Sequence, residues 1–235
     1  MSEPALAFRD VEVRYEPGAK ATLAGLSFEI AAGQRVALLG LNGSGKTTLL
    51  MAAVGLVPHS GEIRIGGVVL QRSSLRSIRD QVGFLFNVPE DQLVFPKVID
   101  DVAFGLLRKG MAPSSAAAKA LRALEALGVG HLAESPVHSL SHGQKQRVAL
   151  AGALAVEPRL ILLDEPSAAL DPPARHALAR LLSGLDAAMI VATHDLGFAA
   201  SVCNRFLVLE EGRIAYDGVD PAQALGRWGL AGEGG

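Results

Sequence analysis

Residues 40–47 read Gly-Leu-Asn-Gly-Ser-Gly-Lys-Thr and fill every fixed position of the phosphate-loop pattern G-x-x-x-x-G-K-[ST]. The apolar run 35–39 predicts a buried strand before the loop, and residues 47–54 predict the helix that follows it. In that context, backbone N–H groups and the helix N-terminus surround phosphate oxygens. The correct flanking elements disfavour the alternative of a chance glycine-rich turn. We expect the nucleotide to be contacted by Gly40, Leu41, Asn42, Gly43, Ser44, Gly45, Lys46, Thr47 and Thr48.

The side chains of this loop have distinct expected tasks. Lys46 is expected to reach the β- and γ-phosphates, and the Thr47 hydroxyl is expected to bind Mg²⁺. The cofactors predicted on this basis are ATP and Mg²⁺.

The bulk composition disfavours several other classes of protein. The 235 residues carry a formal charge of −2, which does not favour a nucleic-acid-binding domain. No run approaches the roughly 18 consecutive apolar residues that a membrane span requires, and residues 1–4 lack the features of a secretory signal. Cys203 is the only cysteine, so no intrachain disulfide is expected. The sequence predicts a cytosolic protein, or one held at a membrane by another subunit.

The order of strand and helix patterns predicts one domain, residues 1–235, with two lobes. Residues 97–157 have helical composition, with an alanine cluster and leucines at helical spacing, and predict a helical subdomain. The early strands predict an antiparallel sheet beside the phosphate-loop core, and the Gly/Ala-rich tail from Gly226 is expected to fray. Strand patterns cover 5–15, 24–30, 61–70 as a hairpin, 160–163, 188–192, and 206–216 as a late hairpin.

Two predicted parallel strands end in polar side chains that suit phosphate chemistry. Asp164 and Glu165 follow the strand 160–163, and ligands of open α/β sheets gather at strand carboxyl ends. We expect Asp164 to hold Mg²⁺ and Glu165 to act as the general base on the attacking water. His194 follows the next strand and is expected to orient the γ-phosphate. Taken alone, the two carboxylates would more often mark a solvated turn, and an isolated histidine would more often be a capping or exposed loop residue. The phosphate loop reverses that preference and favours the catalytic interpretation.

A second phosphate-binding surface is predicted at residues 140–150. Ser141 is a favourable N-cap, and the apolar residues Val148 and Leu150 lie in the helix that it begins. A serine hydroxyl, the Gly143 N–H and the positive end of the helix together suit a phosphate.

This segment resembles the signature motif of ATP-binding-cassette (ABC) ATPases, which usually reads Leu-Ser-Gly-Gly-Gln. Ser141, Gly143 and Gln144 match it, whereas His142 stands where the family has its first glycine. Because Ser141 and Gly143 supply the phosphate donors, we expect the change to be tolerated. The resemblance implies that all four residues, 141–144, contact nucleotide.

Further motifs occur in the family's order from residue 5 to about residue 220. Tyr15 lies where the family has an aromatic residue that stacks on adenine, with a half-buried strand tyrosine as the alternative. Residues 167–171 look like the D-loop, ending in Asp171, and His194 matches the H-loop. The resemblance implies the α/β fold of ABC ATPases: a P-loop NTPase core with a mixed, mainly parallel sheet, an antiparallel β subdomain and a helical subdomain.

Residues 82–93 and 100–105 are similar to energy-coupling-factor ATPases, particularly those of cobalt- and nickel-type importers. Their pattern is Phe-Gln-x-Pro-[Asp/Glu]-Asp-Gln-Leu, and Asn87 occupies the position of the Q-loop glutamine, which links Mg²⁺ and water to the membrane partner. Asn87 keeps the amide oxygen but is shorter by one methylene, about 1.3–1.5 Å of reach. Gln92 belongs to a separate position of the pattern, so the role is not reassigned to it. The Mg²⁺ ligands implied are Thr47, Asp164 and Asn87.

The resemblance implies an ATP-hydrolysing subunit on the cytoplasmic face of the cell membrane. Its implied partners are a second ATPase subunit, as a homodimer, a transmembrane coupling (T) protein and a substrate-binding membrane (S) protein, without nucleic acid. Cobalt or nickel is the expected cargo, and a vitamin is the alternative.

Two other classes are weighed against the importer. A soluble cassette acting on DNA or ribosomes is disfavoured because no sustained heptads separate the two phosphate motifs and only one cassette is present. A small-molecule kinase leaves residues 140–147 unexplained.

Overall fold

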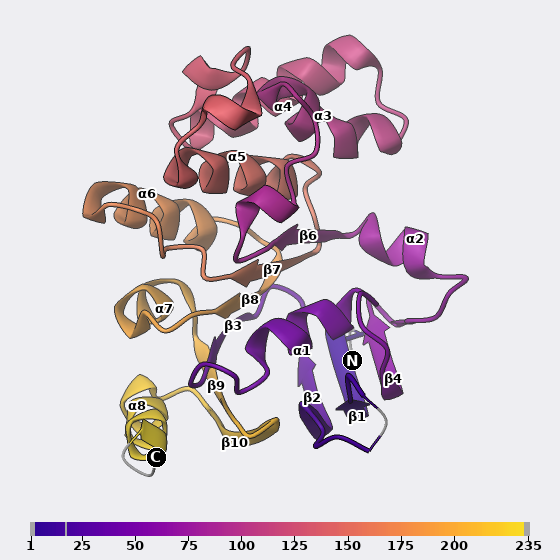
Figure 1. Cartoon of the computed structure of the whole chain (residues 1–235), viewed down its shortest axis with the longest axis vertical. Helices are drawn as coiled ribbons and strands as arrows, with labels where there is room; N and C mark the ends of the chain where they lie inside the picture. Colours follow the sequence, from indigo (N-terminus) through magenta and orange to yellow (C-terminus); the bar gives the residue numbers. More distant parts are fainter. Residues whose placement is uncertain (1–2, 17, 233–235) are drawn as a thin grey trace.

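The computed structural model describes residues 3–16 and 18–232, and for residues 229–232 it describes the backbone. Two sheets organise this part of the chain (Figure 1). A four-stranded antiparallel sheet has the order β2-β1-β4-β5, and a six-stranded sheet has the order β10-β9-β3-β8-β7-β6. Helices α3, α4 and α5 lie at one end of the molecule, and the antiparallel sheet lies at the other. This arrangement confirms the expected α/β fold with a mixed sheet and an antiparallel sheet.

The elements are bounded as follows. The strands are β1 (Leu6–Val13), β2 (Leu23–Ile30), β3 (Arg35–Leu39), β4 (Ser60–Ile65), β5 (Val68–Val69), β6 (Val82–Leu85), β7 (Leu160–Asp164), β8 (Ala188–Ala192), β9 (Arg205–Glu210) and β10 (Arg213–Gly218). The α-helices are α1 (Lys46–Ala53), α2 (Leu75–Arg79), α3 (Val98–Arg108), α4 (Pro113–Ala126), α5 (His142–Ala155), α6 (Pro172–Ser183), α7 (Leu196–Val202) and α8 (Pro221–Gly232).

The parallel strands of the six-stranded sheet are buried on both faces, which explains their continuous apolar runs. Every residue of β7 and β8 is buried. Along β7, alternate side chains enter different cores: Ile161 and Leu163 join the core beneath the helices, whereas Leu160 and Leu162 join the core shared with α1. Strands β9, β3, β8, β7 and β6 run parallel, so their carboxyl ends share one edge of the sheet.

The antiparallel sheet is held to the rest of the molecule by the second of these cores. Strand β2 alternates between buried and exposed side chains, as expected for a sheet with one covered face. Phe8 and Phe28 are cross-strand partners whose rings stack with centroids 4.9 Å apart. Leu49 and Leu50 of α1 are fully buried in the same core. Helix α1 is therefore fixed between the two sheets.

Helices α3, α4 and α5 occupy the segment 97–157, and their placement in one lobe can be followed in Figure 1. Pro113 starts α4 at a position where a missing N–H costs nothing. Leu124 of α4 and Val102 of α3 are buried in the same hydrophobic core. The division of the chain into one domain with this helical subdomain stays a prediction.

Two features of the C-terminal region differ from the sequence expectation. The late hairpin forms, but β9 also pairs with β3 in parallel, so the hairpin extends the main sheet. The expected fraying from Gly226 is wrong for the described residues, because α8 continues to Gly232. Ala224 is fully buried and Trp228 packs on the core, and such packing stabilises a helix whose glycine content alone does not favour it.

Candidate functional site

The phosphate loop connects the end of β3 to α1, and its backbone admits only glycine at two places. Gly40 has φ +156°, and a Cβ there would lie 2.5 Å from the Leu209 carbonyl oxygen. Gly45 has φ +106° and a Cβ there would lie 2.9 Å from the Thr22 carbonyl oxygen. The glycines therefore let neighbouring chain segments close around the turn, as a phosphate cradle requires.

The polar side chains of the loop point into it. Lys46 is 8% exposed, and its Nζ donates to the carbonyl oxygens of Gly40 at 2.7 Å and Leu41 at 3.1 Å. Burial lowers the pKa of Lys46, against the opposing effect of Glu165 and Asp164. Ser44 Oγ is buried and has no hydrogen-bond partner among the described residues. An unpartnered hydroxyl inside a loop with a buried ammonium fits the phosphates of ATP.

The side-chain oxygens of Thr47 and Asp164 lie next to the loop and could both bind a divalent cation. The Thr47 hydroxyl donates to Asp164 Oδ2 at 2.7 Å. Asp164 is 2% exposed, and its pKa is raised mainly by burial, although the Thr47 hydrogen bond lowers it. The described residues contain no cluster of three or more His, Cys, Asp or Glu side chains that could hold a metal alone. This set fits Mg²⁺, which uses one or two protein oxygens together with substrate phosphates.

The Glu165 carboxylate is oriented by the residues that follow β8. Its Oε2 accepts from Thr193 Oγ1 at 3.0 Å and from the His194 backbone N–H at 3.4 Å. His194 Nδ1 lies 3.0 Å from Glu165 Oε1. Thr193, which is fully buried, is not among the residues predicted from the sequence; its place directly before His194 at a strand end was the available signal. The structure thus brings Glu165 and His194 together.

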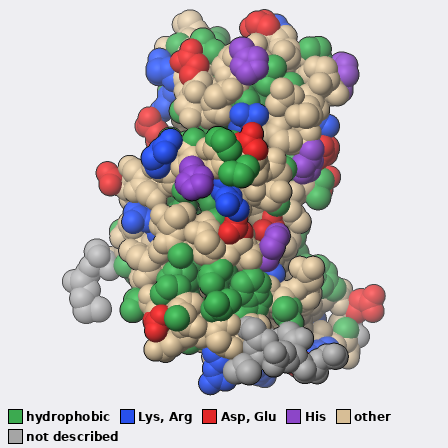
Figure 2. Space-filling model, turned by 90° about the vertical axis from the view of Figure 1, so that its left-hand side faces the viewer, with side chains coloured by type: hydrophobic (Ala, Val, Ile, Leu, Met, Phe, Trp, Pro, Cys, Tyr) green, Lys and Arg blue, Asp and Glu red, His purple; other side chains and the backbone are tan. Residues whose placement is uncertain are grey.

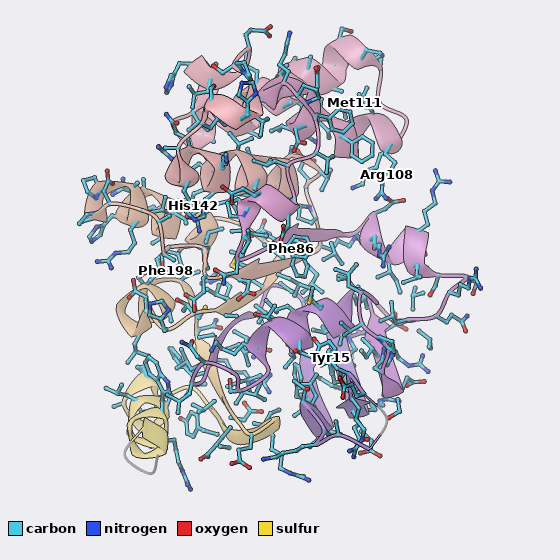
Figure 3. All side chains as sticks on the ribbon, in the orientation of Figure 1. Tyr15, Phe86, Arg108, Met111, His142 and Phe198 are labelled. Carbon is cyan, nitrogen blue, oxygen red and sulfur yellow. The ribbon has the colours of Figure 1, made fainter. Side chains whose placement is uncertain are left out.

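Tyr15 lies beside the first turn of α1 (Figure 3). Its hydroxyl is 3.1 Å from Thr48 Oγ1, and 60% of the residue is exposed. The ring is therefore anchored at its polar end and open at its face, which suits stacking on a planar base.

The signature residues form a capped helix start on α5, which Figure 3 marks at His142, well away from Tyr15. Ser141 Oγ accepts from the Gln144 N–H at 3.4 Å, and Gln144 Oε1 accepts from the Ser141 N–H at 2.8 Å, which is a capping box. Ser141 and His142 are exposed. The helix end faces solvent and not the phosphate loop of its own chain.

His142, the departure from the usual glycine, has a partner in the turn that follows β6. His142 Nδ1 lies 3.5 Å from Glu90 Oε2, and Lys145 Nζ donates to Glu90 Oε1 at 3.0 Å. The Lys145 hydrogen bond is the main cause of a lowered pKa at Glu90. The start of α5 is therefore attached to the turn Pro89–Asp91.

The second signature glycine and the predicted D-loop are in contact. A Cβ at Gly143 would lie 2.8 Å from the Ala169 carbonyl oxygen, so a larger residue would displace the loop. Asp171 caps α6, because its Oδ1 accepts from the Ala174 N–H at 2.8 Å. In the described structure the Asp171 carboxylate thus has a local role in helix capping.

Asn87 is exposed in the loop between β6 and the turn Pro89–Asp91. Gln92 has a different task nearby: its Oε1 accepts from the Phe86 N–H at 3.2 Å, and its Nε2 donates to the Ala149 carbonyl at 3.1 Å. Both ends of the Gln92 amide are therefore used to attach this loop to α5. Asn87 remains the amide that is available to a ligand.

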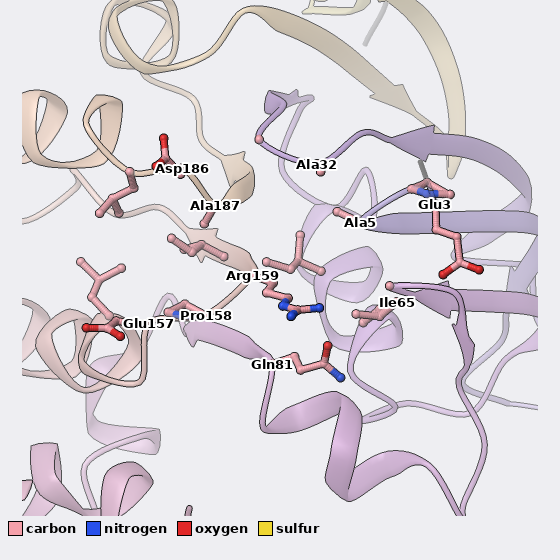
Figure 4. Close-up of a pocket in the computed structure, with 17 residues that line it drawn as sticks. Glu3, Ala5, Ala32, Ile65, Gln81, Glu157, Pro158, Arg159, Asp186 and Ala187 are labelled. Carbon is pink, nitrogen blue, oxygen red and sulfur yellow. The ribbon is translucent and has the colours of Figure 1, made fainter. Parts of the chain in front are cut away.

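A separate cleft of about 650 Å³ opens at the other edge of the sheet (Figure 4). It is lined by residues that precede the parallel strands, among them Gln81, Arg159 and Ala187. The phosphate loop follows the carboxyl end of β3, so this cleft lies away from the nucleotide residues. No helix among the described residues is long and apolar enough to cross a bilayer.

A phosphate loop, two strand-end carboxylates and a mixed parallel sheet define a P-loop ATPase. The chain matches the family model described as "ABC transporter" over residues 23–168. It is 42% identical over 219 residues to a "Putative ABC transporter ATP-binding protein" of Geobacter sulfurreducens, covering 93% of this chain and 88% of that one. The chain belongs to the ABC transporter ATPase family.

Solved structures agree with this assignment. CbiO1 of Clostridium perfringens, described as part of the ABC transporter complex CbiONQ, has a TM-score of 0.81 and 32% identity, covering 95% of this chain and 91% of that chain. The ATP-binding cassette MJ0796, a dimer bound to ADP and Pi in a post-hydrolysis state, has a TM-score of 0.83 and 28% identity, covering 90% of this chain and 97% of that chain. The protein is an ATP-binding, ATP-hydrolysing cassette coupled to transport.

Proposed function

We propose that this chain is the ATP-hydrolysing subunit of an energy-coupling-factor importer for cobalt or nickel ions. It acts at the cytoplasmic face of the membrane with a transmembrane coupling protein and a substrate-binding membrane protein. The observation that carries the proposal is the segment 82–93, which resembles the pattern of energy-coupling-factor ATPases except at Asn87, together with the similarity to CbiO1. The metal is the cargo of the membrane subunits and does not bind this chain.

The active unit is a head-to-tail homodimer. In one chain the phosphate loop is a closed cradle, whereas the helix start at Ser141 is exposed to solvent. A second copy, inverted, supplies its Ser141 and Gly143 to the phosphates held by Lys46. Figure 2 shows a hydrophobic area on the face that carries α6, α7 and α8, and apolar surface of this kind fits contact with another protein.

Each side chain of the site has a task in hydrolysis. Tyr15 stacks on the adenine, and Lys46 with Ser141 of the opposite copy neutralises the γ-phosphate. Glu165 accepts a proton from water as the water oxygen attacks the γ-phosphorus, the bond from that phosphorus to the bridging oxygen breaks, and ADP leaves with the electron pair. His194 orients water and phosphate. Thr47, Asp164 and Asn87 would hold Mg²⁺, which supplies neutralisation of phosphate charge. ATP binding drives closure of the dimer, and hydrolysis resets it.

The coupling protein docks beside Asn87 and the helical lobe. A groove of about 240 Å³ runs between β6 and helices α3 and α5. Its edge carries Val94, which is 73% exposed, and Phe104, whose ring packs 5.1 Å from that of Phe95. Apolar side chains around a groove suit a helix from a partner.

Uptake of cargo tests the transport function. Cells that lack the gene are compared with cells that carry the wild type or Glu165→Gln, using radioactive cobalt and nickel. Uptake of one metal should be lost without the gene and restored only by the wild type. Unchanged metal uptake with altered uptake of biotin or riboflavin would select the vitamin-type importer, the second candidate.

A pull-down from a detergent extract tests the partners. A hydrophobic transmembrane protein should be recovered with this chain. Recovery of ribosomes or DNA instead would favour the soluble cassette.

Cross-linking tests the head-to-tail dimer. Asn42→Cys and His142→Cys place thiols on two exposed positions, one in each phosphate motif. Cys203 does not compete, because burial raises its pKa to about 12. An ATP-dependent cross-linked dimer should form with both substitutions together and with neither alone. A cross-linked dimer that forms with only one of the two thiols would contradict this arrangement. So would the absence of a cross-linked dimer from the double variant in the presence of ATP and the membrane partners.

A further inference from the structure

Gln146 connects the signature helix to the backbone of Glu165. It lies on α5 just after the capping box at Ser141, and it is 2% exposed. Its Nε2 donates to the Glu165 carbonyl oxygen at 2.9 Å. A side chain next to the signature residues is therefore hydrogen-bonded to the backbone of Glu165, whose carboxylate is the proposed general base.

The side-chain amide of Gln146 is directed by this hydrogen bond. Gln146 lines a cavity of about 380 Å³ between α4, α5 and α6. Its Oε1 has no hydrogen-bond partner among the residues that the structure describes. The reverse orientation would place two acceptor oxygens against each other, so the hydrogen bond fixes which end of the amide faces Glu165.

The backbone that receives the bond is itself unusual. Glu165 has φ +51°, in the left-handed region that disfavours a non-glycine residue. Its N–H donates to the Ala192 carbonyl at 2.8 Å, and its carbonyl accepts from the Ala168 N–H at 3.2 Å in addition to Gln146. A strained conformation persists only where its surroundings hold it, and residues at active sites are often held in this way.

We propose that Gln146 is a positioning residue that couples the position of α5 to the direction of the Glu165 carboxylate. The coupling rests on the proposed role of Glu165 as general base. Ser141 and Gln146 belong to one rigid helix, about 7.5 Å apart along its axis. When a phosphate from the opposite copy engages Ser141, displacement of α5 is transmitted through the amide to the carbonyl of Glu165. Hydrolysis is thereby favoured when the signature helix is engaged.

The test compares Gln146→Met with Leu150→Met in the full-length chain, using steady-state phosphate release. Methionine keeps the length of glutamine but removes the donor, and Leu150 lines the same cavity on the same helix without a polar contact. Gln146→Met should lower kcat between about tenfold and a hundredfold, with KM for ATP unchanged, because a small misplacement of a reacting group has effects of this size. Leu150→Met should leave both constants unchanged.

A double substitution separates positioning from general damage. In a Glu165→Gln background the base is already lost, so adding Gln146→Met should lower the residual rate no further. Should Gln146→Met fail to fold, Gln146→Leu removes the same donor without placing an acid in the buried site and is expected to give the same pattern.

Three results would overturn the inference: an unchanged kcat in a folded Gln146 variant, a KM that rises as much as kcat falls, or an additive loss in the Glu165→Gln background. A Glu165→Gln protein with wild-type turnover would instead contradict the proposed function, and thus the failures of the two proposals are distinguishable.

Discussion

The phosphate-loop region, residues 40–48 with Asp164 and Glu165, and the signature region, residues 141–144, bind the same kind of ligand but differ in burial. Lys46, Thr48 and Asp164 are buried, and their side chains are hydrogen-bonded to Gly40, Tyr15 and Thr47, respectively. Ser141 and His142 are exposed, and their hydrogen bonds are made locally, within the helix start or to Glu90. The phosphate-loop region is preorganised by contacts within its own chain. The signature region is preorganised as a capped helix terminus that is exposed to solvent.

This difference separates binding from catalysis. A buried cradle with a desolvated ammonium can hold a nucleotide in a single chain. An exposed helix terminus contributes only when another molecule brings a phosphate to it. We therefore expect substitutions in the first region to affect affinity or chemistry directly, and substitutions in the second to affect turnover through dimerisation.

The largest expected effect is that of Glu165→Gln. Loss of the base should lower turnover by about 10²–10⁴-fold, the range for general base catalysis, while ATP binding is retained because the loop is intact. Phosphate release and equilibrium binding of labelled ATP measure the two quantities. Unimpaired hydrolysis in this variant would falsify the assignment of the base.

Lys46→Ala should mainly reduce nucleotide affinity. Hydrogen bonds from a charged donor contribute about 1.5–3 kcal/mol, so the dissociation constant should rise by about 10- to 100-fold. Titration with ATP measures the effect, and Lys145→Ala serves as a control lysine outside the loop. Equal loss of affinity in both variants would mean that the buried position of Lys46 has no special role.

Ser141→Ala tests the signature region. It should lower turnover while leaving ATP affinity of the single chain unchanged, and it should reduce the free energy of unfolding by about 1 kcal/mol through loss of the N-cap. Ser114→Ala, an exposed serine on α4, is the matched control. Reduced affinity in the monomer would show that the two regions are not separable.

The smallest effect is expected at the edge of the site. Tyr15→Phe keeps the ring and removes only the hydroxyl next to Thr48, so ATP affinity should change by about 1 kcal/mol or less. Tyr15→Ala removes the stacking face and should weaken binding more. Equal affinities in the two variants would contradict adenine stacking.

The sequence predicted the elements that carry strong local patterns. Continuous apolar runs identified β7 and β8 because both faces of these strands are buried, and the fixed glycines identified the loop because no side chain fits there. Thr193 and Gln146 were missed, since their importance comes from contacts with Glu165 that are remote in the chain. Helix α8 was missed because its stability comes from burial of Ala224 and packing of Trp228, which a local composition does not reveal.

The packing of Trp228 also provides an optical signal. This is the only tryptophan of the chain, and it lines a pocket of about 210 Å³ with Gly40–Ser44 and the end of β9. Because indole emission depends on its surroundings, a rearrangement of that turn on nucleotide loading alters the fluorescence of the unmodified protein. Occupancy is then readable in real time, without an added dye.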